Sequence, residues 1–178
     1  MKKIIISLLI FSVLLLTVSC SDYADHPNYE SITYKENGFS IVMRNDMQRY
    51  EANDYDFYFS NVIGTVALTA SRLGEDFLTE NGLSADATAE EYVDYIIDKS
   101  EMDKENLFYE EDKEREAYSF RYTYAEDGKD EVFYYVVVIG GKGNIWYVEM
   151  TCLNSDSEMY LARFEEWKDS IEIYTPTE

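Results

Sequence analysis

The side chains with which this chain could do chemistry are mostly carboxylates. Its 178 residues include 36 Asp and Glu against 15 Lys and Arg, with two cysteines and one histidine, for a formal net charge of −21. The histidine, His26, lies in a polar stretch beside Pro27. Ser-His-Asp catalysis, Cys-His catalysis and zinc sites need histidine or clustered cysteine in the folded part, so we expect none of them.

Carboxylates alone could hydrolyse glycosidic bonds, because two Asp or Glu about 5–10 Å apart are enough. The 36 acidic residues offer many such pairs, and nothing in the sequence singles one out. No catalytic residue is therefore assigned. A carboxylate-based hydrolase acting on glycans stays open as an alternative function.

One dense acidic run suggests a second alternative. Glu110, Glu111 and Asp112 follow one another, and carboxylate oxygens are the ligands that Ca²⁺ prefers. The run lacks the spacing of a dedicated calcium loop, so these three residues are weak Ca²⁺ candidates only, in a Ca²⁺-responsive adhesion module. We favour a solvated acidic face that keeps the protein soluble, and we expect no cofactor. The same negative charge argues against nucleic acid as a partner.

Tyrosine is the other excess, with 17 residues in the chain. Tyrosines on a water-facing strand can stack on sugars or anchor a protein partner, because they combine rigid apolar area with a polar tip. The favoured interpretation is simpler: Tyr118, Tyr122 and Tyr124 share a strand face that packs against helices.

The first 19 residues have the layout of a secretory signal peptide. Lys2 and Lys3 precede the uncharged run from Ile4 to Val18, which spans about 22 Å as a helix and is short for a bilayer core of about 30 Å. The run ends at Ser19 and Cys20. We expect cleavage before Cys20, which would change the net charge from −21 to −23 because the removed residues contain two lysines and no acid.

Leu16-Thr17-Val18-Ser19-Cys20 resembles the bacterial lipobox, in which the cysteine is acylated and becomes the mature N-terminus. The resemblance implies a lipid anchor on Cys20, and two acyl chains give stable membrane binding where one would be marginal. We therefore expect residues 20–30 to be a lipidated cysteine followed by a flexible tether. Cys152 is left as the remaining thiol, and we expect it to be buried and unreactive.

Strand signals dominate from Ser31 onward. Asn37-Gly38 is a tight-turn dipeptide between two apolar stretches and predicts a hairpin of Ile32–Lys35 with Phe39–Met43. Two further strands are predicted at Tyr55–Ser60 and Thr65–Arg72. Thr88-Ala-Glu-Glu91 has the spacing of a capping box, and the apolar stripe that follows predicts a helix to about Ser100.

The second half predicts a three-stranded meander and a closing helix. The strands run from Tyr118 to Tyr124 (with Ser119, Arg121 and Thr123 on a wetter face), from Val132 to Ile139 and from Ile145 to Leu153. Ser155-Asp-Ser-Glu158 is a second capping-box match before an aromatic helix, and Ile171–Tyr174 predicts a short edge strand. The expected fold class is α+β, a mostly antiparallel β-sheet of about six or seven strands flanked by helices.

This order of elements resembles the PsbP-like superfamily, which includes the photosystem protein PsbP and the Ran-binding import factor Mog. The resemblance rests on the hairpin with Gly38-Phe39-Ser40-Ile41, the central helix, the aromatic meander and the aromatic closing helix. It implies an α/β/α sandwich over most of residues 31–174. Metal-binding residues of the photosynthetic branch have no matching motif here, and none is carried over.

We therefore expect a signal peptide over 1–19, a tether over 20–30 and one PsbP-like domain over 31–175. The predicted function is a non-enzymatic binding module, held on the extracytoplasmic face of the cell membrane by lipid on Cys20. Its expected partner is a protein or an envelope component. The alternatives remain an envelope-glycan hydrolase and the Ca²⁺-responsive module.

Overall fold

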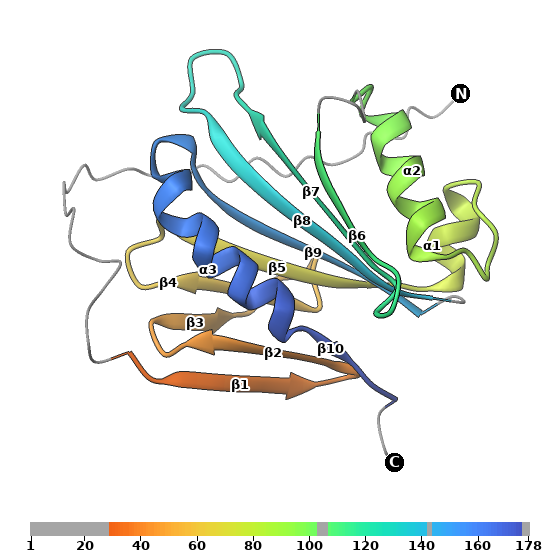
Figure 1. The fold of residues 1–178 in the computed structure, drawn as a ribbon, viewed down its shortest axis with the longest axis horizontal. Coiled ribbons are helices and arrows are strands. Elements are labelled where there is room, and N and C mark those ends of the chain that lie inside the picture. The colour runs from red at the N-terminus through yellow and green to blue at the C-terminus, as the bar shows by residue number, and fades with distance from the viewer. Residues whose placement is uncertain (1–28, 103–106, 142–143, 176–178) are drawn as a thin grey trace.

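Two antiparallel sheets and three helices make up the domain (Figure 1). The computed structural model describes residues 29–102, 107–141 and 144–175. Its strands are β1 (Ser31–Glu36), β2 (Phe39–Arg44), β3 (Met47–Tyr50), β4 (Phe57–Asn61), β5 (Val66–Leu73), β6 (Phe108–Asp112), β7 (Ala117–Tyr124), β8 (Val132–Gly141), β9 (Asn144–Leu153) and β10 (Glu172–Ile173). Its helices are α1 (Glu75–Glu80), α2 (Ala89–Lys99) and α3 (Ser157–Ser170). None of the helices described is long and apolar enough to cross a membrane.

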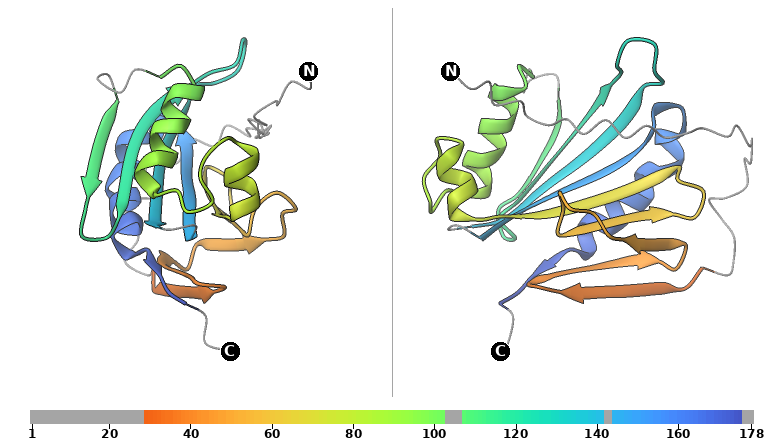
Figure 2. Two further views of the ribbon diagram at one scale, coloured as in Figure 1. Left: turned by 90° about the vertical axis from the view of Figure 1, so that its right-hand side faces the viewer. Right: turned by 180° about the vertical axis from the view of Figure 1, so that it is seen from behind.

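The larger sheet has seven strands in the order β3-β4-β5-β9-β8-β7-β6, and the smaller has three in the order β1-β2-β10. Helix α3 packs against β2, β8 and β9 and so lies against both sheets. Helix α2 packs on β7 and β8. Seen from behind, α1 and α2 cover one end of the opposite face of the larger sheet (Figure 2). The domain is thus layered as α/β/α, with the small sheet extending the α3 side.

Each face of the large sheet has its own core. The core on the α3 side gathers residues of both sheets and of α3, including Phe39, Trp146, Phe164 and Trp167. The core on the α2 side includes Val93, Val136 and Val138. Strand β8 alternates between the two cores, which explains why its sequence is apolar throughout.

The tight turn of the first hairpin and the capping box of the central helix are confirmed. Asn37 and Gly38 have φ of 53° and 91°, as a tight hairpin turn requires, and β1 pairs with β2 from Ser31↔Arg44 to Glu36↔Phe39. In α2 the Glu91 amide donates to Thr88 Oγ1 at 3.3 Å, and the Thr88 amide donates to Glu91 Oε2 at 2.8 Å. The predicted capping box is therefore present.

The second capping box is wrong. A 3₁₀ turn over Asn154–Asp156 follows β9 directly, and α3 begins at Ser157 with Asp156 as N-cap and no side-chain cap bond. The Asn154 amide donates to the Glu131 carbonyl at 2.9 Å. Since this tertiary bond fixes Asn154 at the end of the sheet, the helix starts one residue later than the spacing predicts.

Three further elements were not predicted, and one face was misread. Strands β3 and β6 and helix α1 are short elements in polar stretches. The single expected sheet is two sheets, because β2 pairs with β1 and β10 instead of with β3. Ser119, expected on a wetter face of β7, is 4% exposed because it shares that face with Ala117, which belongs to the core on the α3 side.

Candidate functional site

The structure describes only some of the residues singled out by sequence. Cys20 and His26 lie outside the described residues. Cys152 is 4% exposed in the core on the α3 side, and burial, helped by the charge of Asp156, raises the pKa of its thiol to about 12. A thiol that stays protonated is a poor nucleophile, which agrees with the unreactive cysteine expected.

The calcium candidates lie on edge strand β6. Glu110 Oε2 is 2.8 Å from Lys168 Nζ, and Glu111 Oε1 is 3.3 Å from Lys113 Nζ. Asp112 Oδ1 accepts a hydrogen bond from the Arg115 amide at 3.2 Å. Over the ranges that the structure describes, no three His, Cys, Asp or Glu side chains are grouped to hold a metal ion. Ca²⁺ binding at the run stays a prediction.

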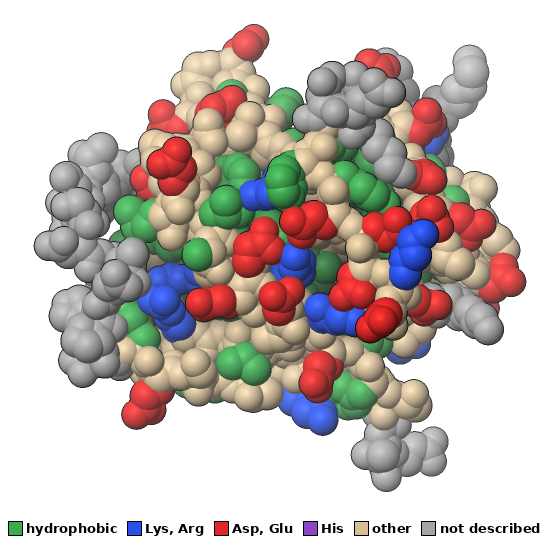
Figure 3. Space-filling model, in the orientation of Figure 1, with side chains coloured by type: hydrophobic (Ala, Val, Ile, Leu, Met, Phe, Trp, Pro, Cys, Tyr) green, Lys and Arg blue, Asp and Glu red, His purple; other side chains and the backbone are tan. Residues whose placement is uncertain are grey.

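The face of the molecule that carries α3 and β6 is rich in mixed charge (Figure 3). Lys168 on α3 lies between Glu110 and Glu165, with its Nζ 2.8 Å from a carboxylate oxygen of each. Burial alone would lower the pKa of Lys168, but the two carboxylates raise it. The acidic side chains here have cationic neighbours, as expected for a solvated and partly paired surface.

A different carboxylate, that of Glu149, lies on the opposite face of the large sheet. Glu149 is at the middle of β9, where Thr69 of β5 and Val136 of β8 are its cross-strand neighbours. Because side chains alternate along a strand, Tyr147 and Thr151 share its face. Helix α2 packs on β7 and β8 and borders this part of the sheet, because the ring of its Tyr92 lies 6.3 Å from that of Tyr147.

Four tyrosines surround this carboxylate, and we call Glu149 with Tyr55, Tyr122, Tyr134 and Tyr147 the tyrosine face. The Tyr147 hydroxyl donates to Glu149 Oε2 at 2.8 Å. Tyr122 and Tyr134 are register partners on β7 and β8, and their rings stack at a centroid distance of 4.7 Å and an interplanar angle of 2°. Tyr55 lies just before β4, and the charge of Glu149 contributes to its raised pKa. Five side chains from three strands and one loop thus converge.

Burial sets the electrostatics of the tyrosine face. It raises the pKa of Glu149, and the hydrogen bond from Tyr147 opposes that rise. Burial and then the charge of Glu149 raise the pKa of Tyr134 to about 12 and that of Tyr147 well above its ordinary value. The side chains of Glu149 and Tyr147 retain partial exposure, and the carboxyl group of Glu149 is held by the Tyr147 hydroxyl.

Sequence reasoning missed this site, although one signal was present. Glu149 is the single charged residue in the stretch from Ile145 to Leu153, between Tyr147 and Thr151 on one strand face. The expectation that Tyr118, Tyr122 and Tyr124 pack against helices holds for Tyr118, which is 8% exposed beneath α2. It is wrong for Tyr124, which is 43% exposed where β7 extends beyond α2.

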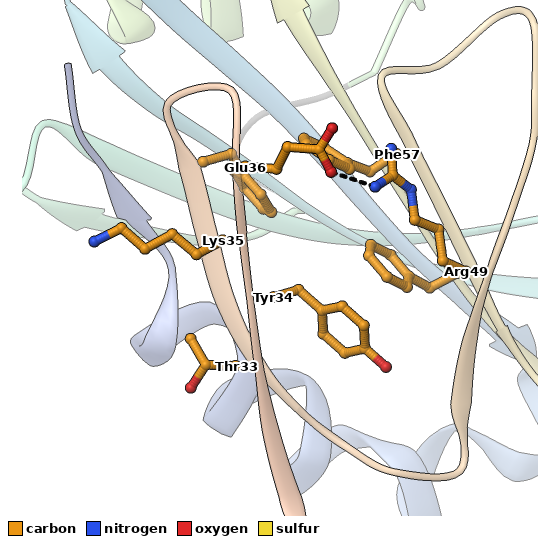
Figure 4. Close-up of a pocket in the computed structure, with 8 residues that line it drawn as sticks. Thr33, Tyr34, Lys35, Glu36, Arg49 and Phe57 are labelled. Carbon is orange, nitrogen blue, oxygen red and sulfur yellow. Dashed lines mark hydrogen bonds and ion pairs between the residues drawn. The ribbon is translucent and has the colours of Figure 1, made fainter. Parts of the chain in front are cut away.

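A pocket of about 220 Å³ lies between the two sheets (Figure 4). Aromatic side chains of β1, β2 and β4 line it, and Glu36 of β1 pairs with Arg49 of β3 across it. The Arg49 guanidinium also lies 5.0 Å from the centre of the Phe57 ring. The Tyr34 hydroxyl donates to the Met47 carbonyl at 2.9 Å. These contacts join two strand edges that do not pair with each other, and we assign the pocket a structural role.

Comparison with known proteins shows that several solved structures are similar to this one. No family model matches the sequence, and no curated protein matches it. The cyanobacterial PsbP (CyanoP) of Synechocystis superposes with a TM-score of 0.54 at 14% identity, over 88% of this chain and 98% of that one. The Saccharomyces cerevisiae Ran-binding protein Mog1p superposes with a TM-score of 0.53 at 10% identity, over 82% of this chain and 95% of that one. A Bacteroides thetaiotaomicron protein superposes with a TM-score of 0.46 at 13% identity over 79% of this chain. This chain spans 47% of that protein's length.

Proposed function

Since this chain has the PsbP/Mog1-like fold, as its sequence resemblance implied, we propose that it is a binding module held outside the cell by lipid on Cys20. Its tyrosine face contacts a protein partner or an envelope component, and it catalyses no reaction. The domain spans residues 31–175, after a signal peptide over 1–19 and a tether over 20–30.

The tyrosine face carries this proposal. Tyrosine is enriched where proteins recognise partners, because its ring buries apolar area at low entropic cost and its hydroxyl offers a hydrogen bond. Here Tyr122, Tyr134 and Tyr147 retain partial exposure on the sheet face that α2 borders. The yeast protein of this fold is a Ran-binding protein, so the fold is compatible with protein binding.

The strand neighbours of Glu149 supply no second carboxyl group for hydrolysis. A glycoside hydrolase needs a second carboxyl group about 5–10 Å from the first. The sheet positions next to Glu149 are Thr69, Val136, Tyr147 and Thr151, none of which is acidic. A half-buried carboxyl group among phenol rings is suited to holding a ligand's polar group in place.

The lipid anchor predicts a complete change of location on mutation. Cys20→Ala removes the thiol that would be acylated, so we expect the protein to leave the membrane fraction or to accumulate as the uncleaved precursor. Palmitate labelling and detergent partitioning of the full chain would measure this. Cys152→Ala is the matched control, because it removes the buried thiol and leaves the lipobox intact. Unchanged labelling of Cys20→Ala would exclude the anchor.

The binding role predicts site-specific crosslinking. A photoreactive amino acid at Tyr124, which is 43% exposed beside the tyrosine face, should give one discrete higher-mass product in living cells. The same amino acid at Ile32, 40% exposed on β1 of the small sheet, is the control and should not give that product. Identical product patterns at both positions, or none at Tyr124, would contradict the proposed face.

A further inference from the structure

Glu149 is a half-buried carboxylate that forms no ion pair with a cation of the described residues. Other carboxylates of the described residues do have a cationic partner. Asp46 Oδ2 lies 3.4 Å from Arg163 Nη1, and Glu110 Oε2 lies 2.8 Å from Lys168 Nζ. Among the described residues, Glu149 forms no ion pair, and its hydrogen-bond partner is the neutral hydroxyl of Tyr147. A carboxylate partly shielded from water and without a counter-charge is unfavourable, and an external cation would reduce that cost.

The groups around Glu149 select the kind of cation. A hard metal ion takes six or more oxygen ligands, and no group of metal-ligating side chains occurs in the described ranges. Phenol rings instead attract organic cations through their π faces, within about 6 Å of the ring centre. Tyr122 and Tyr134 offer such rings as a stacked pair beside the carboxylate. A carboxylate flanked by tyrosine rings suits an ammonium group on an alkyl chain, since the rings bury the chain and the carboxylate pairs with its end.

We propose that the tyrosine face binds the ammonium group of a lysine side chain presented by a protein partner, with Glu149 as its counter-ion and Tyr122 and Tyr134 as the walls. This inference rests on the proposed binding function and names its ligand chemistry. The partner's charge follows from this chain's own: a net charge of −21 attracts basic surfaces and repels acidic ones.

The test is a titration of the labelled protein, followed by two-dimensional NMR, with a short acetylated and amidated Gly-Lys-Gly peptide at constant ionic strength. We expect saturable shifts at the amides of β5, β8 and β9 around Glu149, with a dissociation constant on the order of 1 mM. The same peptide with Nε-acetylated lysine should give none. Glu149→Gln should weaken binding at least tenfold, because the shape is kept and the charge is lost.

Two controls separate the proposal from its alternatives. Glu36→Gln removes one carboxylate on the small sheet and should bind the peptide as the native protein does. Burial raises the pKa of Glu149, so its ionised form destabilises the fold at neutral pH, and Glu149→Gln should melt no lower than the native protein at pH 7. A lower melting temperature would show a folding defect in Glu149→Gln. Tyr134→Phe and Tyr134→Ala would then be compared, and loss of peptide binding is expected for Tyr134→Ala alone.

Three results would overturn the inference. Equal binding of the peptide by native protein and Glu149→Gln would exclude the carboxylate, and equal binding of the acetylated peptide would exclude the ammonium group. Tighter binding of n-butylammonium than of the peptide would point to a free amine instead of a protein side chain. If crosslinking at Tyr124 persists under any of these results, the binding function stands and the lysine assignment fails.

Discussion

Replacement of Arg163 by Ala is expected to lower the free energy of unfolding by about 3–5 kcal/mol. Arg163 of α3 and Asp46 of the β2–β3 turn are buried, with side chains 6% and 9% exposed, and Arg163 Nη1 lies 3.4 Å from Asp46 Oδ2. The guanidinium also lies 5.2 Å from the centre of the Tyr160 ring. Without it, the Asp46 carboxylate would stay buried and lose its ion-pair partner, and among the described residues its Oδ1 already has no hydrogen-bond partner.

Urea unfolding followed by the fluorescence of Trp146 and Trp167, both buried, would measure this loss. Lys129→Ala is the control, because its pair with Glu126 is exposed and should contribute under about 1 kcal/mol. The double variant Arg163→Met with Asp46→Leu should lose less than Arg163→Ala, since removing both charges leaves no unpaired ion. A loss below 1 kcal/mol for Arg163→Ala would mean that water reaches this pair.

Alkaline pH is expected to unfold the domain between about pH 10 and 12. Burial raises the pKa of Tyr135, which is 1% exposed, to about 12 and raises the pKa of Tyr92 and Tyr122 further. An unfolded chain ionises its tyrosines near pH 10, so between pH 10 and the folded pKa the native state holds more protons than the unfolded state. Stability is therefore complete below about pH 10 and falls as the pH rises.

Tyr135 by itself would account for a loss of about 2–3 kcal/mol by pH 12, and several buried tyrosines act in the same direction. Absorbance at 295 nm, which reports phenolate, should rise in one cooperative step that coincides with loss of circular dichroism. Tyr135→Phe should make the decline of stability with pH shallower, whereas Tyr124→Phe, on an exposed side chain, should leave it unchanged. Gradual ionisation of the tyrosines in a domain that stays folded would contradict this account.

Local sequence signals predicted most of the elements that form by themselves. The Asn37-Gly38 turn, the Thr88–Glu91 capping box and the alternation along β7 and β9 involve residues within a few positions of each other. Such patterns depend on backbone geometry and on the period of the apolar residues, so a single sequence shows them. The order of these elements was enough to predict the PsbP-like fold class.

Elements that depend on distant partners could not be predicted in this way. Strand β3 has four residues with a single buried position, Met47, and it forms because β4 pairs with it. Arg163 and Asp46 are 117 positions apart, so their ion pair exists only after α3 packs beside the β2–β3 turn. The second capping box failed for the same reason, because a contact with Glu131 fixes the start of the turn before α3.

The sequence by itself determined the α+β class, the expectation that histidine and cysteine catalysis is absent, and the prediction of a lipid anchor at Cys20. Only the tertiary structure decided that the sheet divides in two and that tyrosines gather around Glu149. Tyr147 and Glu149 share a strand, but Tyr122 and Tyr134 reach them through the register of β7 on β8 and of β8 on β9. A shift of one residue in either register would turn those rings to the other face, since side chains alternate along a strand.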